Sequence, residues 1–161
     1  MNQCCSRATR RIAFATVGDA TELAYWSGTP FHMWNSLATE GHDVIHVGPL
    51  NAPELPFYKA YSKLCRTFRM RGPSPYHAAA VATQYGADAE NKIRAVSPDV
   101  VFAPAGSNFA WKVPRRIPLV YVSDATFRLI ENYHPDFRTL TRGAREITDS
   151  LERRTIARAD L

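Results

Sequence analysis

Short apolar runs alternate along the chain with stretches in which apolar side chains recur every three or four positions. The runs predict four strands, over residues 12–17, 43–48, 99–104 and 118–122. Several are continuously apolar, which is typical of strands buried on both faces of a parallel sheet. Because strands and helices alternate, we expect βαβ units with right-handed crossovers. The pattern therefore predicts an α/β fold, a three-layer Rossmann-like domain with a mainly parallel sheet.

Helical spacing of apolar residues predicts four helices, over residues 29–41, 57–70, 74–96 and 142–159. Thr29 is a suitable N-cap for the first helix, and Pro30 suits its first position, where no backbone N–H is needed. In the last helix, which is highly charged, we expect Ile147, Leu151 and Ile156 to face the core. No internal repeat or low-complexity segment interrupts the alternation.

Length and composition fit one domain with its own core, since the chain has 161 residues, of which 45% are hydrophobic and 22% charged. We expect residues 1–10 to be a poorly ordered segment and residues 11–161 to form the domain. The three cysteines, Cys4, Cys5 and Cys65, provide neither a disulfide framework nor zinc-ligand spacing, which favours a reducing cytoplasm. No apolar run is long enough for a transmembrane helix, and the N-terminus lacks the apolar region of a secretory signal. The net charge of +5 permits an anionic ligand but does not indicate nucleic acid.

The loops after the four strands are expected to meet at one edge of the sheet, where parallel sheets bind their ligands. These loops are rich in small and hydroxyl side chains of the kind that bind polyols and phosphates, at residues 26–29, 49–50, 105–108 and 123–126. In the first loop, Gly28 allows close backbone approach, and the helix that follows presents unpaired N–H groups that favour anions. A tight strand-to-helix turn without a ligand is the alternative explanation of the same residues.

Several common nucleotide-binding and hydrolase motifs are missing from the sequence. The first loop lacks G-x-G-x-x-G, and no P-loop or G-x-S-x-G sequence occurs. The order and spacing of four segments instead resemble family 4 glycosyltransferases of the GT-B fold: WSGTPFHMWNSLATEGHDVIHVGPL, PDVVFAPAGSN, PLVYVSDATF and LERRTIARADL. The resemblance extends over residues 11–161.

The resemblance implies the N-terminal, acceptor-side domain of a two-domain enzyme, with the C-terminal donor-binding domain absent from this chain. Enzymes of that family transfer a sugar from a nucleoside-diphosphate sugar to an acceptor hydroxyl, with retention at the anomeric carbon. The implied partners are a nucleotide-sugar donor, a hydroxyl acceptor and a C-terminal GT-B domain, with no cofactor and no metal ion. The isolated domain is then expected to be inactive, because both domains must close around the substrates.

By the same resemblance, Ser27, Gly28 and Thr29 are the predicted contacts to the donor phosphates. Many family members carry two glycines in this loop, whereas this chain has one glycine beside hydroxyl groups. Trp26 either stacks on a sugar ring or packs beside the start of the helix.

Asp124 stands near the position where many family members carry a histidine after the fourth strand. It is the predicted catalytic residue, whose carboxylate hydrogen-bonds a sugar hydroxyl or orients the acceptor. The alternative is that Asp124, or Ser123 before it, only caps the next helix. Asn108 is the second predicted hydroxyl contact. His134 is a further candidate, although a loop histidine before proline is more often structural or solvated.

Two other functions stay open. The chain is either a non-catalytic Rossmann-like module that binds a ligand or a partner protein, or an unrelated α/β binding domain. Antiparallel strands or a buried Gly28 loop would favour the unrelated domain. An in-frame continuation beyond Leu161 into a second domain would favour the enzyme.

Residues 57–71 combine an apolar, aromatic face with five Lys and Arg and no Asp or Glu. The favoured interpretation is a helix whose apolar face packs on the core and whose basic side is solvated. The alternative is peripheral contact with an anionic membrane, to which each basic group near the surface contributes about 1 kcal/mol. Burial of Tyr61, Leu64 and Phe68 would leave only the electrostatic part of that contact. In both cases we expect a cytoplasmic protein.

Overall fold

The computed structural model describes residues 8–161. The predictions for Cys4 and Cys5 lie outside the described residues, as does most of the segment 1–10 that we expect to be poorly ordered. The third cysteine, Cys65, is buried and has a free thiol. No helix within residues 8–161 is long and apolar enough to cross a membrane.

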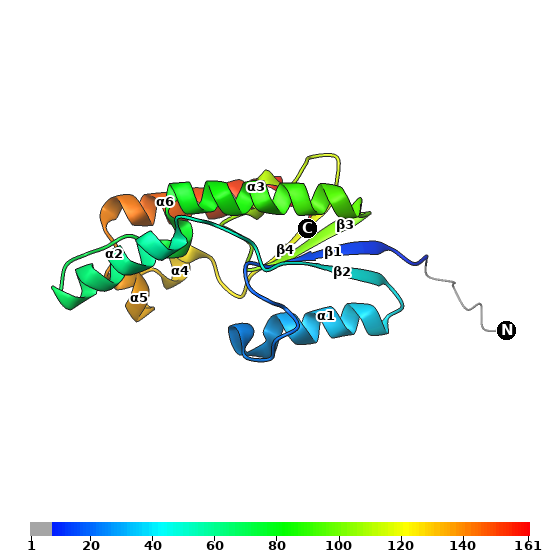
Figure 1. Cartoon of the computed structure of the whole chain (residues 1–161), viewed down its shortest axis with the longest axis horizontal. Coiled ribbons are helices and arrows are strands. Elements are labelled where there is room, and N and C mark those ends of the chain that lie inside the picture. The colour runs from blue at the N-terminus through cyan, green and yellow to red at the C-terminus, as the bar shows by residue number, and fades with distance from the viewer. Residues whose placement is uncertain (1–7) are drawn as a thin grey trace.

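Four strands form one sheet in which every neighbouring pair is parallel (Figure 1). They are β1 (Arg11–Ala15), β2 (Asp43–Val47), β3 (Val100–Pro104) and β4 (Leu119–Val122), in the order β2-β1-β3-β4. Each overlaps its predicted range, so the predicted parallel sheet is confirmed. In the central strand β1, every residue after Arg11 is buried, as expected of a strand covered on both faces.

Helices cover both faces of the sheet, giving a three-layer Rossmann-like α/β domain (Figure 1). α1 (Thr29–Thr39) lies on one face, and α3 (Ala79–Val96) and α6 (Arg142–Arg158) lie on the other. The other helical segments are η1 (Tyr25–Gly28), α2 (Leu55–Thr67), η2 (Pro75–His77), η3 (Ala110–Lys112), α4 (Phe127–Ile130) and α5 (Pro135–Arg138). α2, α4 and α5 lie beyond the carboxyl ends of the strands (Figure 1).

Helix α3 supplies one side of the hydrophobic core. Its predicted apolar stripe is confirmed, since Val81, Tyr85, Ala89 and Ile93 are each at most 1% exposed. Their spacing of four residues brings them to one helix face, where they pack in a single cluster with residues of β1, β3 and β4. The helix ends at Val96, and its C-cap residue Ser97 has a left-handed backbone with φ of 50°.

The prediction for helix α6 is wrong in part. Leu151 is buried, but Ile147 and Ile156 are 37% and 47% exposed. The face turned toward the protein is instead mostly polar and includes Thr148, Asp149, Glu152, Thr155 and Arg158. This face packs against η3 and α4, where helix ends and loops have backbone groups that need hydrogen-bond partners. Apolar spacing does not detect a buried face of this kind.

The start of α1 also differs from the prediction. Its N-cap is Gly28, not Thr29, and no side chain caps the helix. Gly28 has φ of 76°, a left-handed conformation that glycine adopts without strain. Thr29 is the first helical residue, and Pro30 follows in the first turn, where its missing N–H leaves no bond unmade. Trp26 and Ser27 are also left-handed, with φ of 44° and 55°.

Helix α2 contradicts the favoured interpretation of residues 57–71. Phe57, Tyr61, Leu64 and Phe68 are between 48% and 66% exposed, and Cys65 is the buried residue of the helix. The helix lies beyond the carboxyl ends of the strands and not over a face of the sheet (Figure 1). Few residues of α2 are therefore buried against the rest of the protein, and its apolar stripe is exposed.

Candidate functional site

The strand order places a switch point between β1 and β3. From β1 the chain moves to β2 on one side, and from β3 it moves to β4 on the other, and α/β sheets bind ligands at such a point. A cavity of about 680 Å³ lies there, with Val17 after β1 and Ala105 after β3 in its wall. We call it the α2 cavity, because α2 forms part of its outer wall. Its polar lining includes Lys59, Lys63, Arg66, Ser74, His77 and Asn108.

A second cavity, of about 370 Å³, lies beyond β4, and we call it the β4 cavity. Its lining includes Trp26, Ser107, Tyr121, Ser123, Asp124 and Glu152. His77, Ala105 and Phe137 line both cavities, so the two adjoin. Three of the four predicted loops therefore meet here, whereas the loop at residues 49–50 lines neither cavity.

The predicted site residues divide between the two cavities and the turn beside them. Trp26, 40% exposed, and Asp124 come together in the wall of the β4 cavity. Asn108 lines the α2 cavity. Residues 27–29, the predicted donor-phosphate contacts, line neither cavity.

Gly28 is buried at the turn between η1 and α1. A Cβ atom at this position would lie 3.3 Å from the carbonyl oxygen of Leu23 and 3.7 Å from the ring of His32. Protein therefore surrounds the Cα, while Ser27 and Thr29 on either side are exposed. Their hydroxyl groups are the accessible part of the phosphate contact, which stays a prediction.

The carboxylate of Asp124 has no hydrogen bond or ion pair with any residue in the described range 8–161. It does not cap α4, whose N-cap is Thr126 and makes no side-chain cap bond. Ser123 does not cap it either, because its hydroxyl donates to the carbonyl oxygen of Ala125 at 2.9 Å. The capping explanation of both residues is therefore wrong, and the Asp124 carboxylate faces the β4 cavity without a protein partner.

His77 joins the walls of the two cavities. Its Nδ1 lies 3.1 Å from the hydroxyl oxygen of Ser74, and its Nε2 lies 3.3 Å from that of Ser107. Burial lowers the pKa of His77 to about 4, so the imidazole is neutral at pH 7. A neutral ring donates through one nitrogen and accepts through the other, so the three side chains form a polar chain without net charge.

His134, the other candidate histidine, has a local structural role. It is the N-cap of α5, where its Nδ1 accepts a hydrogen bond from the backbone N–H of Asp136 at 3.4 Å. Its ring packs on Phe137, with the ring centroids 5.2 Å apart. His134 also lines the β4 cavity, so it stays within reach of a ligand there.

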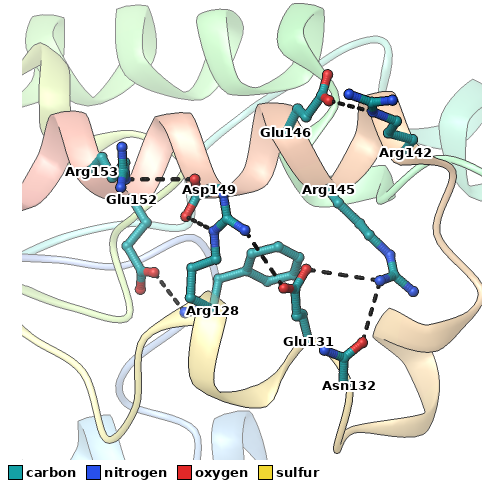
Figure 2. Close-up of polar contacts among 10 residues, drawn as sticks. Arg128, Glu131, Asn132, Arg142, Arg145, Glu146, Asp149, Glu152 and Arg153 are labelled. Carbon is teal, nitrogen blue, oxygen red and sulfur yellow. Dashed lines mark hydrogen bonds and ion pairs between the residues drawn. The ribbon is translucent and has the colours of Figure 1, made fainter.

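Glu152 brings a buried carboxylate to the β4 cavity. It is 6% exposed, and its Oε2 accepts a hydrogen bond from the backbone N–H of Phe127 at 2.6 Å (Figure 2). Its Oε1 accepts from the hydroxyl of Tyr121 at 3.3 Å. Burial, with a smaller contribution from the Glu152 charge, raises the pKa of Tyr121 to about 12, so the hydroxyl keeps its proton at neutral pH.

Ion pairs hold the short helix α4 against α6 beside this carboxylate. Figure 2 shows Arg128 of α4 directed toward Asp149 of α6, with Nε and Oδ1 3.0 Å apart. Glu131 lies between Arg128 and Arg145, at 3.8 Å and 3.9 Å. These pairs fix one wall of the β4 cavity, since Phe127 and Ile130 of α4 line it.

Asn108 has one partner for its side-chain amide within the described residues. It is 5% exposed, and its Nδ2 donates to the carbonyl oxygen of Tyr76 at 3.3 Å. Its Oδ1 is buried and has no partner within residues 8–161. A buried acceptor without a partner is costly, and this oxygen is covered by protein, so a ligand hydroxyl in the α2 cavity would reach it after a change of the Asn108 side-chain rotamer.

Sequence analysis missed His77 and Glu152. A histidine in a proline-containing turn and a glutamate in a strongly charged helix are usually solvated, so no spacing marked either one. Within residues 8–161, no group of three or more His, Cys, Asp or Glu side chains is arranged to hold a metal ion. The cavities instead present hydroxyl, amide and imidazole groups with separate charged side chains, a set that suits hydrogen bonding to a polyol.

No family model, curated protein or solved structure matches this chain. The family resemblance accordingly depends on the sequence segments described above.

Proposed function

We propose that this chain is the acceptor-side domain of a retaining two-domain glycosyltransferase, which transfers a sugar from a nucleoside-diphosphate sugar to an acceptor hydroxyl. The observation that carries the proposal is that a buried amide oxygen without a partner, on Asn108, and an exposed carboxylate, on Asp124, belong to adjoining cavities at the switch point of a parallel sheet. The resemblance of the sequence to family 4 glycosyltransferases supplies the reaction class.

In this proposal the acceptor occupies the α2 cavity. The Oδ1 of Asn108 accepts a hydrogen bond from one acceptor hydroxyl, which gives this buried oxygen the partner that it lacks. Tyr25 and Tyr76, which also line the cavity, offer aromatic surfaces to the apolar face of a sugar ring. The neutral His77 and the hydroxyl of Ser74 add polar groups without charge.

Asp124 acts at the reacting end of the acceptor. Its carboxylate accepts a hydrogen bond from the attacking hydroxyl or from a neighbouring one, which orients the acceptor for attack. Trp26, across the same cavity, packs against the transferred sugar. In a protein that carries both domains, Asp124→Asn is expected to lower kcat with little effect on folding, because the side chain is exposed.

The donor diphosphate binds at the start of α1. The leaving phosphate develops negative charge, and the N-terminus of an α-helix stabilises an anion with its unpaired N–H groups. Ser27 and Thr29 add exposed hydroxyl donors beside it. This mechanism needs no metal ion.

Binding of neutral sugars to the 161-residue chain tests the acceptor site. We expect members of a panel of hexoses and N-acetylhexosamines to bind, as detected by saturation-transfer-difference NMR. Asn108→Ala is expected to weaken binding about tenfold, since one hydrogen bond contributes about 1 kcal/mol or more. The matched control is Asn91→Ala, at an exposed position on α3, which leaves binding unchanged. Binding of no sugar, or equal loss in both variants with their folds intact by circular dichroism, contradicts the proposal.

One observation favours a second candidate, a binding module that is an unrelated α/β domain. Gly28 is buried, although Ser27 and Thr29 beside it are exposed, and a buried Gly28 is what we expect of a domain that does not bring this backbone to a donor phosphate. Such a module binds a ligand in the α2 cavity but has no use for a donor. The in-frame sequence after Leu161 separates the two: the enzyme requires a second, donor-binding domain there, and the module does not.

A further inference from the structure

We propose that the α2 cavity binds a ligand with a phosphate or a similar anionic group, held by Lys59, Lys63 and Arg66 of α2. The ligand class is a phosphorylated sugar or polyol, either free or as the head group of a lipid. The identification of this ligand with the acceptor depends on the proposed function, whereas the anion site itself does not.

The three basic residues come from one flank of α2. They are spaced by four and three positions, which puts them on neighbouring turns of the same helix side. All three line the cavity, whereas Arg69 and Arg71 after the helix do not. The basic character of this segment is therefore directed in part into a cavity and is not only a solvated surface.

None of the three cations has a carboxylate partner within residues 8–161. Some basic residues on other helices have one, as Arg94 has Glu90 at 2.6 Å. Lys59 instead lies over the ring of Tyr76, with its Nζ 5.1 Å from the centroid. The charge of this flank is thus available to a ligand.

The other charged groups around the cavity leave it positive. Asp136 is the one carboxylate among the residues that line it, and its side chain is 73% exposed at the rim. His77 is neutral at pH 7. Three exposed cations therefore outnumber one exposed carboxylate around the cavity, and a phosphate with nearly two negative charges is attracted.

A second observation points to a ligand with both anionic and hydroxyl groups. The Oδ1 of Asn108 is an unpartnered oxygen on a residue that is 5% exposed. An oxygen acceptor repels phosphate but accepts from a hydroxyl. Because Asn108 and the cations of α2 line the same cavity, a phosphorylated polyol satisfies both at once.

The exposed apolar side chains of α2 give a physical reason to test lipids as well. Phe57, Tyr61, Leu64 and Phe68 form an exposed apolar stripe, in which Phe57 and Tyr61 stack with centroids 6.3 Å apart. A stripe of this kind inserts at a lipid interface, so vesicles are tested together with the free sugar phosphate. A free sugar phosphate does not need the stripe.

The experiment compares two variants that remove equal charge. Lys63→Gln/Arg66→Gln changes the cavity, and Arg69→Gln/Arg71→Gln changes exposed residues outside it. Each is titrated with glucose, glucose 6-phosphate and inorganic phosphate by amide NMR. Each is also sedimented with phosphatidylinositol-containing vesicles and with phosphatidylcholine vesicles. All four positions are exposed, so both variants are expected to fold.

The expected result is that the unmodified chain binds glucose 6-phosphate at least tenfold more tightly than glucose, or binds phosphatidylinositol vesicles at least tenfold more tightly than phosphatidylcholine vesicles. The cavity variant loses this preference and the control variant keeps it. The sugar phosphate result identifies a free ligand, and the vesicle result identifies a lipid head group.

Three results overturn the anion site: equal affinity for glucose and glucose 6-phosphate with no vesicle preference, equal loss in both variants, or binding of no probe. The proposed function is tested separately. Glucose binding without a phosphate preference leaves the acceptor site in place and removes the anion site. If inorganic phosphate binds and the sugar adds nothing to the affinity, the anion site is supported and the proposed acceptor site is contradicted.

Discussion

The Nε2 atom of His77 lies 3.3 Å from the hydroxyl oxygen of Ser107, which connects the η2 turn with the loop after β3. Ser107 is fixed from its other side, because its carbonyl oxygen accepts a hydrogen bond from the hydroxyl of Thr155 on α6 at 3.2 Å. Three segments distant in sequence are therefore held together at the wall shared by the two cavities. The shape of the candidate site depends on a neutral imidazole at its centre.

The stability of the fold is expected to fall at acid pH because of His77. Its pKa is about 4 in the folded state and near 6.5 when unfolded, so between these values the unfolded chain binds more protons. The free energy of unfolding therefore falls as pH falls through this window, by about 2 kcal/mol between pH 7 and pH 4.5 from this group. His77→Gln removes this part of the pH dependence, as measured by urea unfolding at both pH values. His32→Gln, at an exposed position on α1, is the control and keeps it. Parallel pH profiles for the chain and His77→Gln contradict the account.

Glu152 is expected to be structurally important although it is charged. Glu152→Ala leaves the N–H of Phe127 and the hydroxyl of Tyr121 without their acceptor, which costs about 2–3 kcal/mol of unfolding free energy. Glu152→Gln keeps an acceptor oxygen and costs less. The control is Glu146→Ala on the same helix, which breaks the exposed pair with Arg142 at 2.8 Å and costs less than about 1 kcal/mol (Figure 2). Equal effects of the two alanine variants in urea unfolding would show that the Glu152 carboxylate is not needed.

In the left-handed turn before α1, substitutions at two adjacent residues are expected to change stability in opposite directions. Ser27 has φ of 55°, and Ser27→Gly relieves strain of about 1–2 kcal/mol against a smaller entropic cost, for a net gain of about 0.5–1 kcal/mol. Gly28→Ala introduces strain of about 1–2 kcal/mol and places a Cβ 3.3 Å from the Leu23 oxygen. Thermal and urea unfolding measure both changes. A loss of activity in a Gly28 variant therefore bears on phosphate binding only if the fold is unchanged.

Because the apolar stripe of α2 is exposed, we expect polar substitutions in it to change stability little, whereas the same substitutions in a core helix would be destabilising. Leu64→Ser is expected to change the free energy of unfolding by less than about 0.5 kcal/mol, because Leu64 is 52% exposed. Its neighbour Cys65 is 2% exposed, so Cys65→Ser is expected to cost about 1–3 kcal/mol. If Leu64→Ser is the more destabilising of the two in urea unfolding, α2 packs differently from the arrangement described.

The elements that sequence analysis predicts well are those whose periodicity reflects apolar burial. The strand over Arg11–Ala15 and the stripe from Val81 to Ile93 face one continuous core, so their hydrophobicity follows their geometry. Apolar periodicity does not predict the buried face of α6, because polar side chains on that face hydrogen-bond to backbone groups of other segments. Arg158, 8% exposed, donates to the carbonyl oxygens of Val113, Pro114 and Ile117.

The sequence predicts where the candidate site lies on the sheet, but only some of the residues that form it. The rule that loops meet at the carboxyl edge of a parallel sheet brings Trp26 and Asp124 to one cavity. It does not reveal which side chains lack partners, since Asn108 and Asp124 differ from other polar residues only in three dimensions. Nor does it reveal that α2 turns its apolar side outward, because a helical stripe has the same spacing whether it is buried or exposed.

The most direct test of the central claim is the location of sugar binding on the chain. The ¹⁵N-labelled protein is titrated with a panel of hexoses, N-acetylhexosamines and hexose phosphates, and amide chemical-shift changes are mapped on the structure. The account predicts saturable changes concentrated at the walls of the α2 cavity, at Val17, His77, Ala105 and Asn108. Changes concentrated on the outer surface of α6 instead, or no change with any member of the panel, would contradict it.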